Sequence, residues 1–264
     1  LSNSNLTWEI SKEYNFGLDF AMINNHVRLG FEYYNKETEG SILNRQLSSI
    51  TGFGSAVGNF GSVRNKGVEL TLNTVNVRTK DFSWKTSINF SKNTNEILKL
   101  DGDLDEIPYG SHGVLKIGEA VDAIYAYDKV GIWQLDEAAD AAVYNAVPGQ
   151  YKYVDQNNDN LINQDDKVVL GSISPEWTGG MTNNFAYKNL DFSVQMHTRQ
   201  GVLGHSEFYQ HFAPYQGDDG KFNKVDLDYW TPNNQDAKYP APEYGHPGEW
   251  YFENFDFVRI GNIG

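Results

Sequence analysis

A strict alternation of apolar and polar residues, repeated in successive hairpins, constrains this chain most. Apolar residues occupy every second position in Phe16–Met22 and again in Val27–Tyr33, on either side of Asn24-Asn25. Successive side chains of a strand point to opposite faces of a sheet, so this period predicts strands, and the asparagine pair predicts a turn. We therefore expect a hairpin near residues 7–35 with one apolar and one polar face.

The same pattern predicts two more hairpins and a last strand. The hairpins lie near residues 67–91 and 177–198, with polar turns at Arg78–Asp81 and Lys188-Asn189, and the last strand runs from residue 255. Long loops separate these elements and cover residues 36–66, 92–176 and 199–254. Short turns at one end and long loops at the other are typical of outer-membrane β-barrels, whose strands alternate apolar-out and polar-in.

The composition excludes several classes of protein. The absence of cysteine removes disulfides, thiolate catalysis and zinc–sulfur sites. The net charge is -14, and residues 92–176 alone carry 16 acidic and 6 basic residues, which argues against a nucleic-acid partner. No motif of a catalytic site stands out, so the sequence does not predict an enzyme.

About seven long strands can be counted, and this number bears on the architecture. Single-chain bacterial barrels have even numbers of strands, and an open sheet with two long free edges is prone to aggregate. The simplest interpretation is a segment of a larger barrel. A soluble β-sandwich remains an alternative, because alternation also serves sheets with one solvated face.

Several motifs follow one another in an order that resembles a known family. They are Tyr33–Thr38, Asn59–Leu70, Asp81–Trp84, Asn89–Ser91, Gly131–Trp133, Thr178–Gly180, Lys188–Phe192, Thr231–Asn233, Lys238–Pro240 and Phe257–Asn262. Taken together, they resemble the SusC/RagA-type TonB-dependent outer-membrane transporters of Bacteroidetes. The resemblance is to the C-terminal part of the β-barrel of that family.

This resemblance implies an all-β fold, namely an antiparallel transmembrane β-barrel segment with about seven strands of a barrel of roughly 22, and long extracellular loops. It implies that the plug domain and the final strands are absent from residues 1–264. It also implies a place in the lipid bilayer of the bacterial outer membrane and import of a nutrient, either a glycan or oligosaccharide or an oligopeptide. The implied partners are a SusD-like surface lipoprotein over the loops and TonB, which would act through the missing N-terminal part. The alternatives are a soluble, calcium-stabilised β-protein that binds carbohydrate and a passive porin.

The sharpest local motif has the spacing of an EF-hand calcium loop. Its oxygen donors at positions 1, 3, 5, 7, 9 and 12 are Asp155, Asn157, Asp159, the carbonyl of Leu161, Asn163 and Asp166. Position 6 is Asn160 instead of glycine, and asparagine also tolerates a positive φ. We therefore expect a calcium site that makes a long loop rigid, with a metal-free Asx-rich turn as the alternative.

Aromatic residues are frequent in the long loops, especially in residues 199–254. Flat rings beside Asp, Asn and Gln side chains suit sugars, and Tyr and Trp also anchor protein partners. The candidate contacts with a ligand or partner are Trp133, Tyr215, Tyr229, Trp230 and Trp250. Internal packing of the loops is the alternative for most of the rings.

Overall fold

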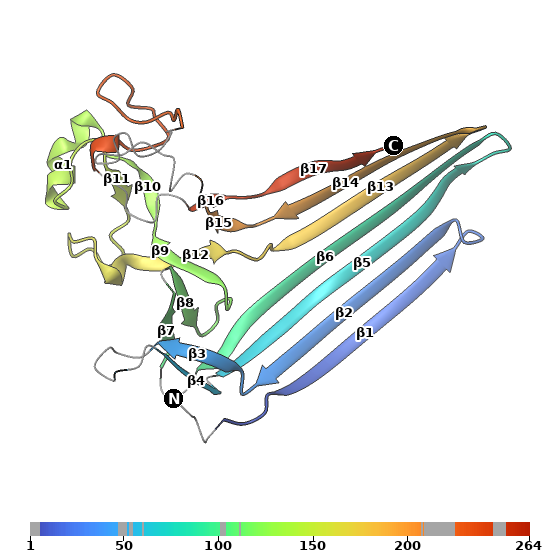
Figure 1. The fold of residues 1–264 in the computed structure, drawn as a ribbon, viewed down its shortest axis with the longest axis horizontal. Coiled ribbons are helices and arrows are strands. Elements are labelled where there is room, and N and C mark those ends of the chain that lie inside the picture. Colours follow the sequence, from blue (N-terminus) through green and yellow to red (C-terminus); the bar gives the residue numbers. More distant parts are fainter. Residues whose placement is uncertain are drawn as a thin grey trace. The chain divides into compact units, whose positions relative to one another are not determined.

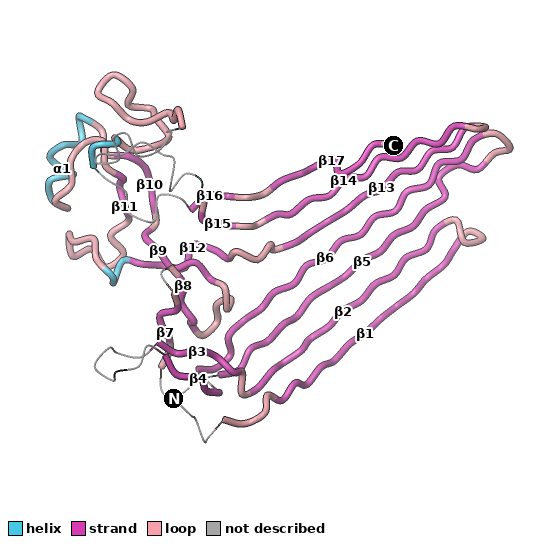
Figure 2. Tube along the Cα trace, viewed as in Figure 1, coloured by secondary structure: helices cyan, strands magenta, loops and turns pink. Residues whose placement is uncertain are grey.

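Strands make up most of this protein (Figures 1 and 2). The computed structural model describes residues 6–46, 52, 55–59, 61–100, 104–110, 112–206, 208, 225–244 and 252–264. The long strands are β1 (Ile10–Met22), β2 (Val27–Glu39), β5 (Gly61–Arg78), β6 (Phe82–Leu100), β13 (Trp177–Tyr187), β14 (Leu190–Gln200) and β17 (Phe257–Ile263). They form one seven-stranded sheet whose neighbours follow chain order and pair antiparallel. The prediction of an all-β fold with seven long strands is confirmed.

The chain divides into two compact units. The first covers residues 1–123, 171–202 and 255–264, and the second covers residues 124–170 and 203–254. Besides the large sheet, the first unit holds β3 (Ile42–Gln46), β4 (Ser55–Asn59), β7 (Glu106–Tyr109) and β8 (Gly113–Lys116). The second unit holds most of β9 (Ala123–Tyr127) and β12 (Lys167–Ser172), together with β10 (Lys129–Ile132), β11 (Tyr151–Tyr153), β15 (Leu203–His205) and β16 (Phe252–Asn254). Its helical pieces, drawn cyan in Figure 2, are η2 (Leu135–Glu137), α1 (Ala138–Val143), η3 (Gln164–Asp166) and η4 (Pro242–Tyr244).

Three tight turns join the long strands at one end of the large sheet (Figure 1). Asn24 and Asn25 connect β1 to β2 with φ angles of 52° and 64°, and Lys188 connects β13 to β14 with φ 51°. The turn between β5 and β6 is closed by a hydrogen bond of 2.8 Å from the backbone N–H of Thr79 to the carbonyl of Phe82. In the turn between β1 and β2, asparagine tolerates the left-handed backbone, which explains why this short connection forms where the sequence predicts it.

The register gives the large sheet two different faces. One cross-strand row runs through all seven strands and consists of Phe20, Leu29, Leu72, Ile88, Met181, Met196 and Ile260. The row one residue along each strand consists of Asp19, Gly30, Thr71, Asn89, Gly180, His197 and Arg259. Because adjacent residues point to opposite faces, the sheet is apolar on one side and polar on the other.

Large apolar side chains on this sheet are exposed. Phe16, Leu18 and Phe20 on β1 are 60%, 50% and 51% exposed. Water-soluble proteins rarely leave so large a contiguous apolar surface uncovered, whereas the outer face of a membrane barrel meets hydrocarbon. The helices in the described residues are all too short or too polar to cross a membrane.

The strands are longer than the sequence predicts. β2 ends at Glu39 and not near residue 35, β5 begins at Gly61 and not near 67, and β6 ends at Leu100 and not near 91. In these extensions the face that carries Leu70 and Phe90 nearer the tight turns carries charged residues such as Arg64 and Lys92. The apolar alternation therefore stops while the backbone ladder continues, which is why sequence periodicity makes β2, β5 and β6 too short at the ends far from the tight turns.

Buried apolar clusters stabilise the long connections between the strands. In the first unit Ile97, Leu100, Ile107 and Leu115 pack together. In the second unit one cluster contains Ile132, Trp230, Ala237 and Ala241, and another contains Ile124, Ala126 and Phe252. The long connections are thus packed structures with cores of their own.

Candidate functional site

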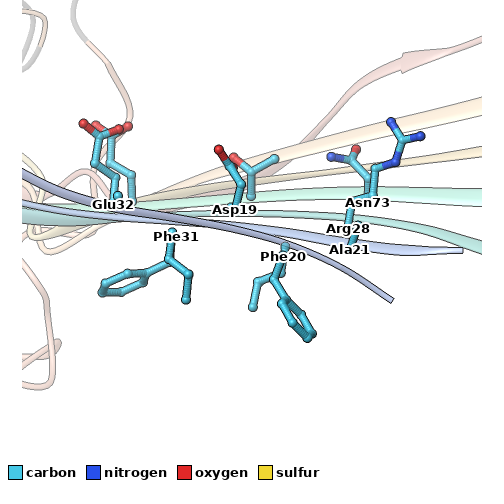
Figure 3. A pocket seen from close by; sticks show the side chains of 13 residues that line it. Asp19, Phe20, Ala21, Arg28, Phe31, Glu32 and Asn73 are labelled. Atoms are coloured by element: carbon cyan, nitrogen blue, oxygen red, sulfur yellow. The ribbon is translucent and has the colours of Figure 1, made fainter. Parts of the chain in front are cut away.

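The polar face of the large sheet is the first candidate site. Figure 3 shows Asp19, Arg28, Glu32 and Asn73 projecting to one side of the strands, and Phe20 and Phe31 to the other. The residues around this part of the sheet come from β1, β2 and β5. Such a face offers hydrogen-bond donors and acceptors to water and to polar solutes, which a channel wall requires.

Charges of both signs lie on the polar face. The acidic residues Asp19, Glu32 and Glu69 lie on β1, β2 and β5. Basic residues share this face on β2, β6, β14 and β17, and they are Arg28, Lys36, Lys85, Arg199 and Arg259. Acidic and basic side chains of one wall therefore face the same space.

A cavity in the second unit is the other candidate site. Its volume is about 440 Å³, within the range of small-molecule sites. Its lining combines ammonium, amide, phenol and carboxylate groups and includes Lys129, Gln134, Tyr151, Gln235, Lys238 and Glu253. The sequence alone does not indicate these residues as a group, although the motifs Gly131–Trp133 and Lys238–Pro240 both contribute to the lining.

A small polar network forms one wall of this cavity. Lys238 Nζ donates to Glu253 Oε1 at 2.9 Å, and the Tyr239 hydroxyl donates to the same oxygen at 2.9 Å. The hydrogen bond to Glu253 raises the pKa of Lys238 to about 12, and burial raises the pKa of Tyr239. At neutral pH this wall therefore presents a charged ammonium paired with a carboxylate.

The predicted aromatic contacts do not all lie at the surface. Trp133 and Trp230 are only 4% and 3% exposed, whereas Tyr229 is 38% exposed. Trp230 Nε1 donates to Gln134 Oε1 at 2.9 Å. Tyr215 and Trp250 lie outside the described residues. In this structure Trp133 and Trp230 pack inside the second unit and offer almost no ring surface to a ligand.

The environment of Trp133 shows how it packs. Its ring stacks on Tyr144 with 5.9 Å between the ring centroids, and Lys152 Nζ lies 4.3 Å from the Trp133 centroid. Lys152 also donates to Glu137 Oε1 at 2.7 Å, and this hydrogen bond lowers the pKa of Glu137. The ion pair with Glu137 thus holds the Lys152 ammonium in place over the Trp133 ring.

The predicted calcium loop folds into a tight series of Asx turns. Asp155 Oδ1 and Oδ2 accept the backbone N–H groups of Asp159 and Asn160 at 3.2 and 2.9 Å. Asn160, at position 6, has a φ of 65°, as its replacement of glycine requires. The side chains of Asp155, Asn157, Asp159 and Asn163 each accept a backbone N–H group of the same loop.

Asp166 closes this loop from its last position. It is completely buried, and its Oδ1 and Oδ2 accept the N–H groups of Gln156 and Asn163, both at 2.8 Å. Nowhere in the described residues do three acidic or histidine side chains gather as a ligand set. The loop thus brings Asp155, Asn157, Asp159, Asn163 and Asp166 into one turn, held by amide hydrogen bonds.

Comparison with known proteins decides between the architectures. No protein-family model matches the chain. TonB-dependent receptor P26 of Formosa agariphila is 38% identical over 277 residues, covering 99% of this chain and 28% of that receptor. TonB-dependent receptor SusC of Bacteroides thetaiotaomicron is 31% identical over 207 residues, covering 74% of this chain and 20% of SusC.

This chain is a barrel segment of the SusC/RagA type of TonB-dependent receptor. Solved structures agree on the fold: the RagAB peptide transporter matches with a TM-score of 0.82 at 24% identity, over 100% of this chain and 29% of that one. The RagAB peptide importer in its closed-closed state matches with a TM-score of 0.78 at 25% identity. These relatives are named as receptors and transporters and not as enzymes.

The receptor segment spans under a third of the relatives it matches, 28% of receptor P26 and 29% of the RagAB chain. The two-faced sheet therefore corresponds to part of a barrel wall, as the sequence predicts.

Proposed function

We propose that the complete protein is a TonB-dependent transporter that imports a nutrient across the bacterial outer membrane. The observation that supports this proposal most strongly is the seven-stranded sheet, in which apolar cross-strand rows alternate with polar rows. Its apolar face meets lipid and its polar face lines the lumen, as expected for a barrel of this kind. The tight turns are periplasmic and the long connections between the strands are extracellular.

The substrate we propose is a glycan, an oligosaccharide or an oligopeptide. The cavity in the second unit supports a ligand rich in hydroxyl or amide groups, since its lining mixes Gln134, Gln235 and tyrosine rings with charged side chains. The name of the RagAB transporter specifies peptides for that protein. A SusD-like surface lipoprotein covers the loops, and TonB supplies energy through a part of the protein outside residues 1–264.

The alternatives are a passive porin and a soluble carbohydrate-binding protein. The soluble protein is disfavoured by the open apolar face of β1, where Leu18 and Phe20 are about half exposed. The porin is disfavoured by the receptor relatives, which are named for their dependence on TonB.

Uptake by intact cells tests the proposal. Cells with the gene deleted are compared with complemented cells for uptake of labelled oligosaccharides and oligopeptides, with and without a protonophore. We expect uptake of one class to require both the gene and the proton-motive force. Gene-dependent uptake that persists with the protonophore would support the porin, and recovery of the protein in the soluble fraction would support the binding protein.

We also propose that calcium binds the loop 155–166. Support comes from the oxygen donors at EF-hand spacing, the positive φ of Asn160 and the completely buried carboxylate of Asp166. A bound ion would draw the carboxylates of Asp155, Asp159 and Asp166 together, neutralise them and hold the turn rigid.

Limited proteolysis of the whole receptor tests the calcium proposal. We expect calcium to protect the loop against cleavage compared with a chelator, and Asp155→Ala with Asp159→Ala to abolish this difference. The control variant, Asp136→Ala with Asp140→Ala, removes two exposed carboxylates from the same unit and should keep it. Equal cleavage of the parent protein with and without calcium would contradict the proposal.

A further inference from the structure

Two lysines stand on the apolar face of the large sheet. In the pairing of β5 with β6, Lys92 lies opposite Val68 and Lys66 lies opposite Thr94, so both share the face of Leu70 and Phe90. Both residues are exposed, and neither side chain makes a hydrogen bond or ion pair among the described residues. The two lysines are diagonal neighbours, whose Cβ atoms lie within about 7–8 Å in such a ladder.

The height of this pair coincides with one edge of the apolar band. On β6 the outward positions from the tight turn are Phe82, Trp84, Thr86, Ile88 and Phe90, and the next is Lys92. The ten residue steps from Phe82 to Lys92 extend about 34 Å along the strand, or about 26 Å along the membrane normal at a tilt of about 40°. This height equals the apolar band of about 25 Å that outer-membrane barrels present to lipid.

Aromatic side chains mark the same level on the neighbouring strands. Phe16 and Tyr33 lie in the cross-strand row of Val68 and Lys92, and they are 60% and 41% exposed. Aromatic rings concentrate at membrane–water interfaces. The lysine pair therefore sits where lipid headgroups meet the barrel.

The nearby carboxylates are already paired with other cations. One row further from the tight turns, Arg64 lies 3.5 Å from Glu37 and 3.9 Å from Glu96, and Lys12 Nζ lies 2.7 Å from Glu39. Like charges at neighbouring positions repel one another unless an anion compensates them. No carboxylate in the described residues compensates Lys66 and Lys92. We therefore expect an anion from outside the chain to compensate their positive charges.

We propose that Lys66 and Lys92 bind the phosphate of a lipid headgroup, specifically a phosphorylated glycolipid of the outer leaflet. The proposal rests on the proposed membrane location and on the extracellular position of the long loops. The two ammonium groups hold the phosphate, and the rings of Phe16 and Tyr33 contact the acyl chains beneath it. Lipid-facing lysines at this level gain about 1 kcal/mol each from an anionic surface, so the pair strengthens binding roughly thirtyfold.

Lipid retention by the purified full receptor tests the proposal. The receptor is exchanged into detergent with diphosphoryl lipid A, dephosphorylated lipid A or phosphatidylglycerol, and bound lipid is counted by native mass spectrometry. We expect diphosphoryl lipid A to bind, and Lys66→Gln with Lys92→Gln to weaken its binding roughly thirtyfold. The control Lys36→Gln with Lys85→Gln removes two lysines from the polar face and should leave binding unchanged.

Each outcome separates this proposal from the proposed function. Equal binding of phosphorylated and dephosphorylated lipid A by the unaltered receptor would overturn it without any variant. Loss of lipid A binding in the control as much as in the lysine variant would also overturn it. Preference for phosphatidylglycerol would support the phosphate site and contradict the outer-leaflet assignment. A receptor missing from the outer-membrane fraction would contradict the proposed function itself.

Discussion

The missing Cβ of Gly67 lets side chains of two neighbouring strands meet above it. Tyr34 of β2 reaches across Gly67, and its hydroxyl donates to Asn93 Oδ1 of β6 at 2.9 Å. A Cβ at Gly67 would lie 2.5 Å from the Tyr34 hydroxyl oxygen and 2.6 Å from the backbone oxygen of Lys92. This glycine of the motif Asn59–Leu70 is therefore required by a close approach and not by its backbone angles.

Replacing this glycine should destabilise the barrel. Gly67→Ala forces Tyr34 out of its place and costs about 1–3 kcal/mol, as overpacking does in cores. Gly17→Ala is the matched control, because nothing lies within 4 Å of a Cβ there. The measurement is the thermal unfolding midpoint of the detergent-solubilised receptor, which should fall for the first variant only. Equal midpoints for the two variants would contradict the role assigned to Tyr34.

At the residue scale, local conformation could be predicted from sequence and burial could not. The positive φ of Asn160 follows from its position in the loop motif and is present at 65°. The burial of Trp230 depends on Gln134, its partner 96 positions away. No local sequence pattern contains such a contact. A tryptophan that packs inside the protein therefore cannot be told apart by sequence from one that contacts a ligand.

The faces of β5 lead to a prediction at the scale of one strand. Leu70 lies between Phe31 and Phe90 on the apolar face, and Thr71 lies between Gly30 and Asn89 on the polar face. Leu70→Lys places a charge toward hydrocarbon one row inside the level of Lys92, where the cost falls from about 2–4 kcal/mol at the bilayer midplane toward about 1 kcal/mol. Thr71→Lys places the same charge toward water and should cost far less.

The measurement is the fraction of full receptor that reaches the outer membrane as a folded, heat-modifiable band. We expect a partial decrease for Leu70→Lys and normal assembly for Thr71→Lys. Unchanged assembly of Leu70→Lys would show that this face does not meet lipid, and impaired assembly of Thr71→Lys alone would reverse the assignment of the faces.

A second prediction concerns the segments that lead into β9 and out of β12. Asp122 accepts hydrogen bonds from the hydroxyls of Ser172, at 2.8 Å, and Ser174. Burial alone would raise the pKa of this carboxyl, but the hydrogen bonds from Ser174 and Ser172 outweigh it and hold the pKa below its ordinary 3.8. The ionised Asp122 carboxylate therefore makes its full contribution to the free energy of unfolding above pH 4. This contribution is lost as the pH falls through the lowered pKa of Asp122.

Hydrogen exchange of residues 171–174 at different pH values checks this prediction. The backbone N–H groups of Ile173 and Ser174 bond to the Asp122 carbonyl and the Ser172 hydroxyl, so their exchange, corrected for intrinsic rate, reports the contact. We expect protection to decrease below pH 4 and Asp122→Asn to lose on the order of 1 kcal/mol of it at neutral pH, because the site is half-exposed. Protection that is independent of both pH and Asp122 would contradict the assignment.

At the element scale, sequence predicts strands where their environment imposes a pattern. The turns and the apolar rows follow directly from alternation, because lipid selects one face and water the other. The extension of β5 to Gly61 and of β6 to Leu100 cannot be predicted from alternation, since both faces carry polar residues there. The strands of the second unit cannot be predicted in this way either, because β11 and β16 contain only three residues each.

The large sheet ends in two long strands at the scale of the whole molecule. β1 and β17 stand at the two ends of the strand order, and every residue of β1 is exposed. An edge in hydrocarbon leaves N–H and C=O groups unpaired at several kcal/mol each, so a membrane sheet must close into a barrel. The outer edges of β1 and β17 therefore pair with further strands in the complete receptor.

Residues 1–264 produced alone should accordingly fail to form a barrel. After refolding in detergent, we expect the full receptor to give a compact, heat-modifiable band and this segment to aggregate, because exposed strand edges pair with one another. The assay compares electrophoretic mobility with and without boiling, and light scattering measures aggregation. A monomeric, heat-modifiable band from the segment would mean that its seven strands close on themselves, and the barrel wall would then be complete within this chain.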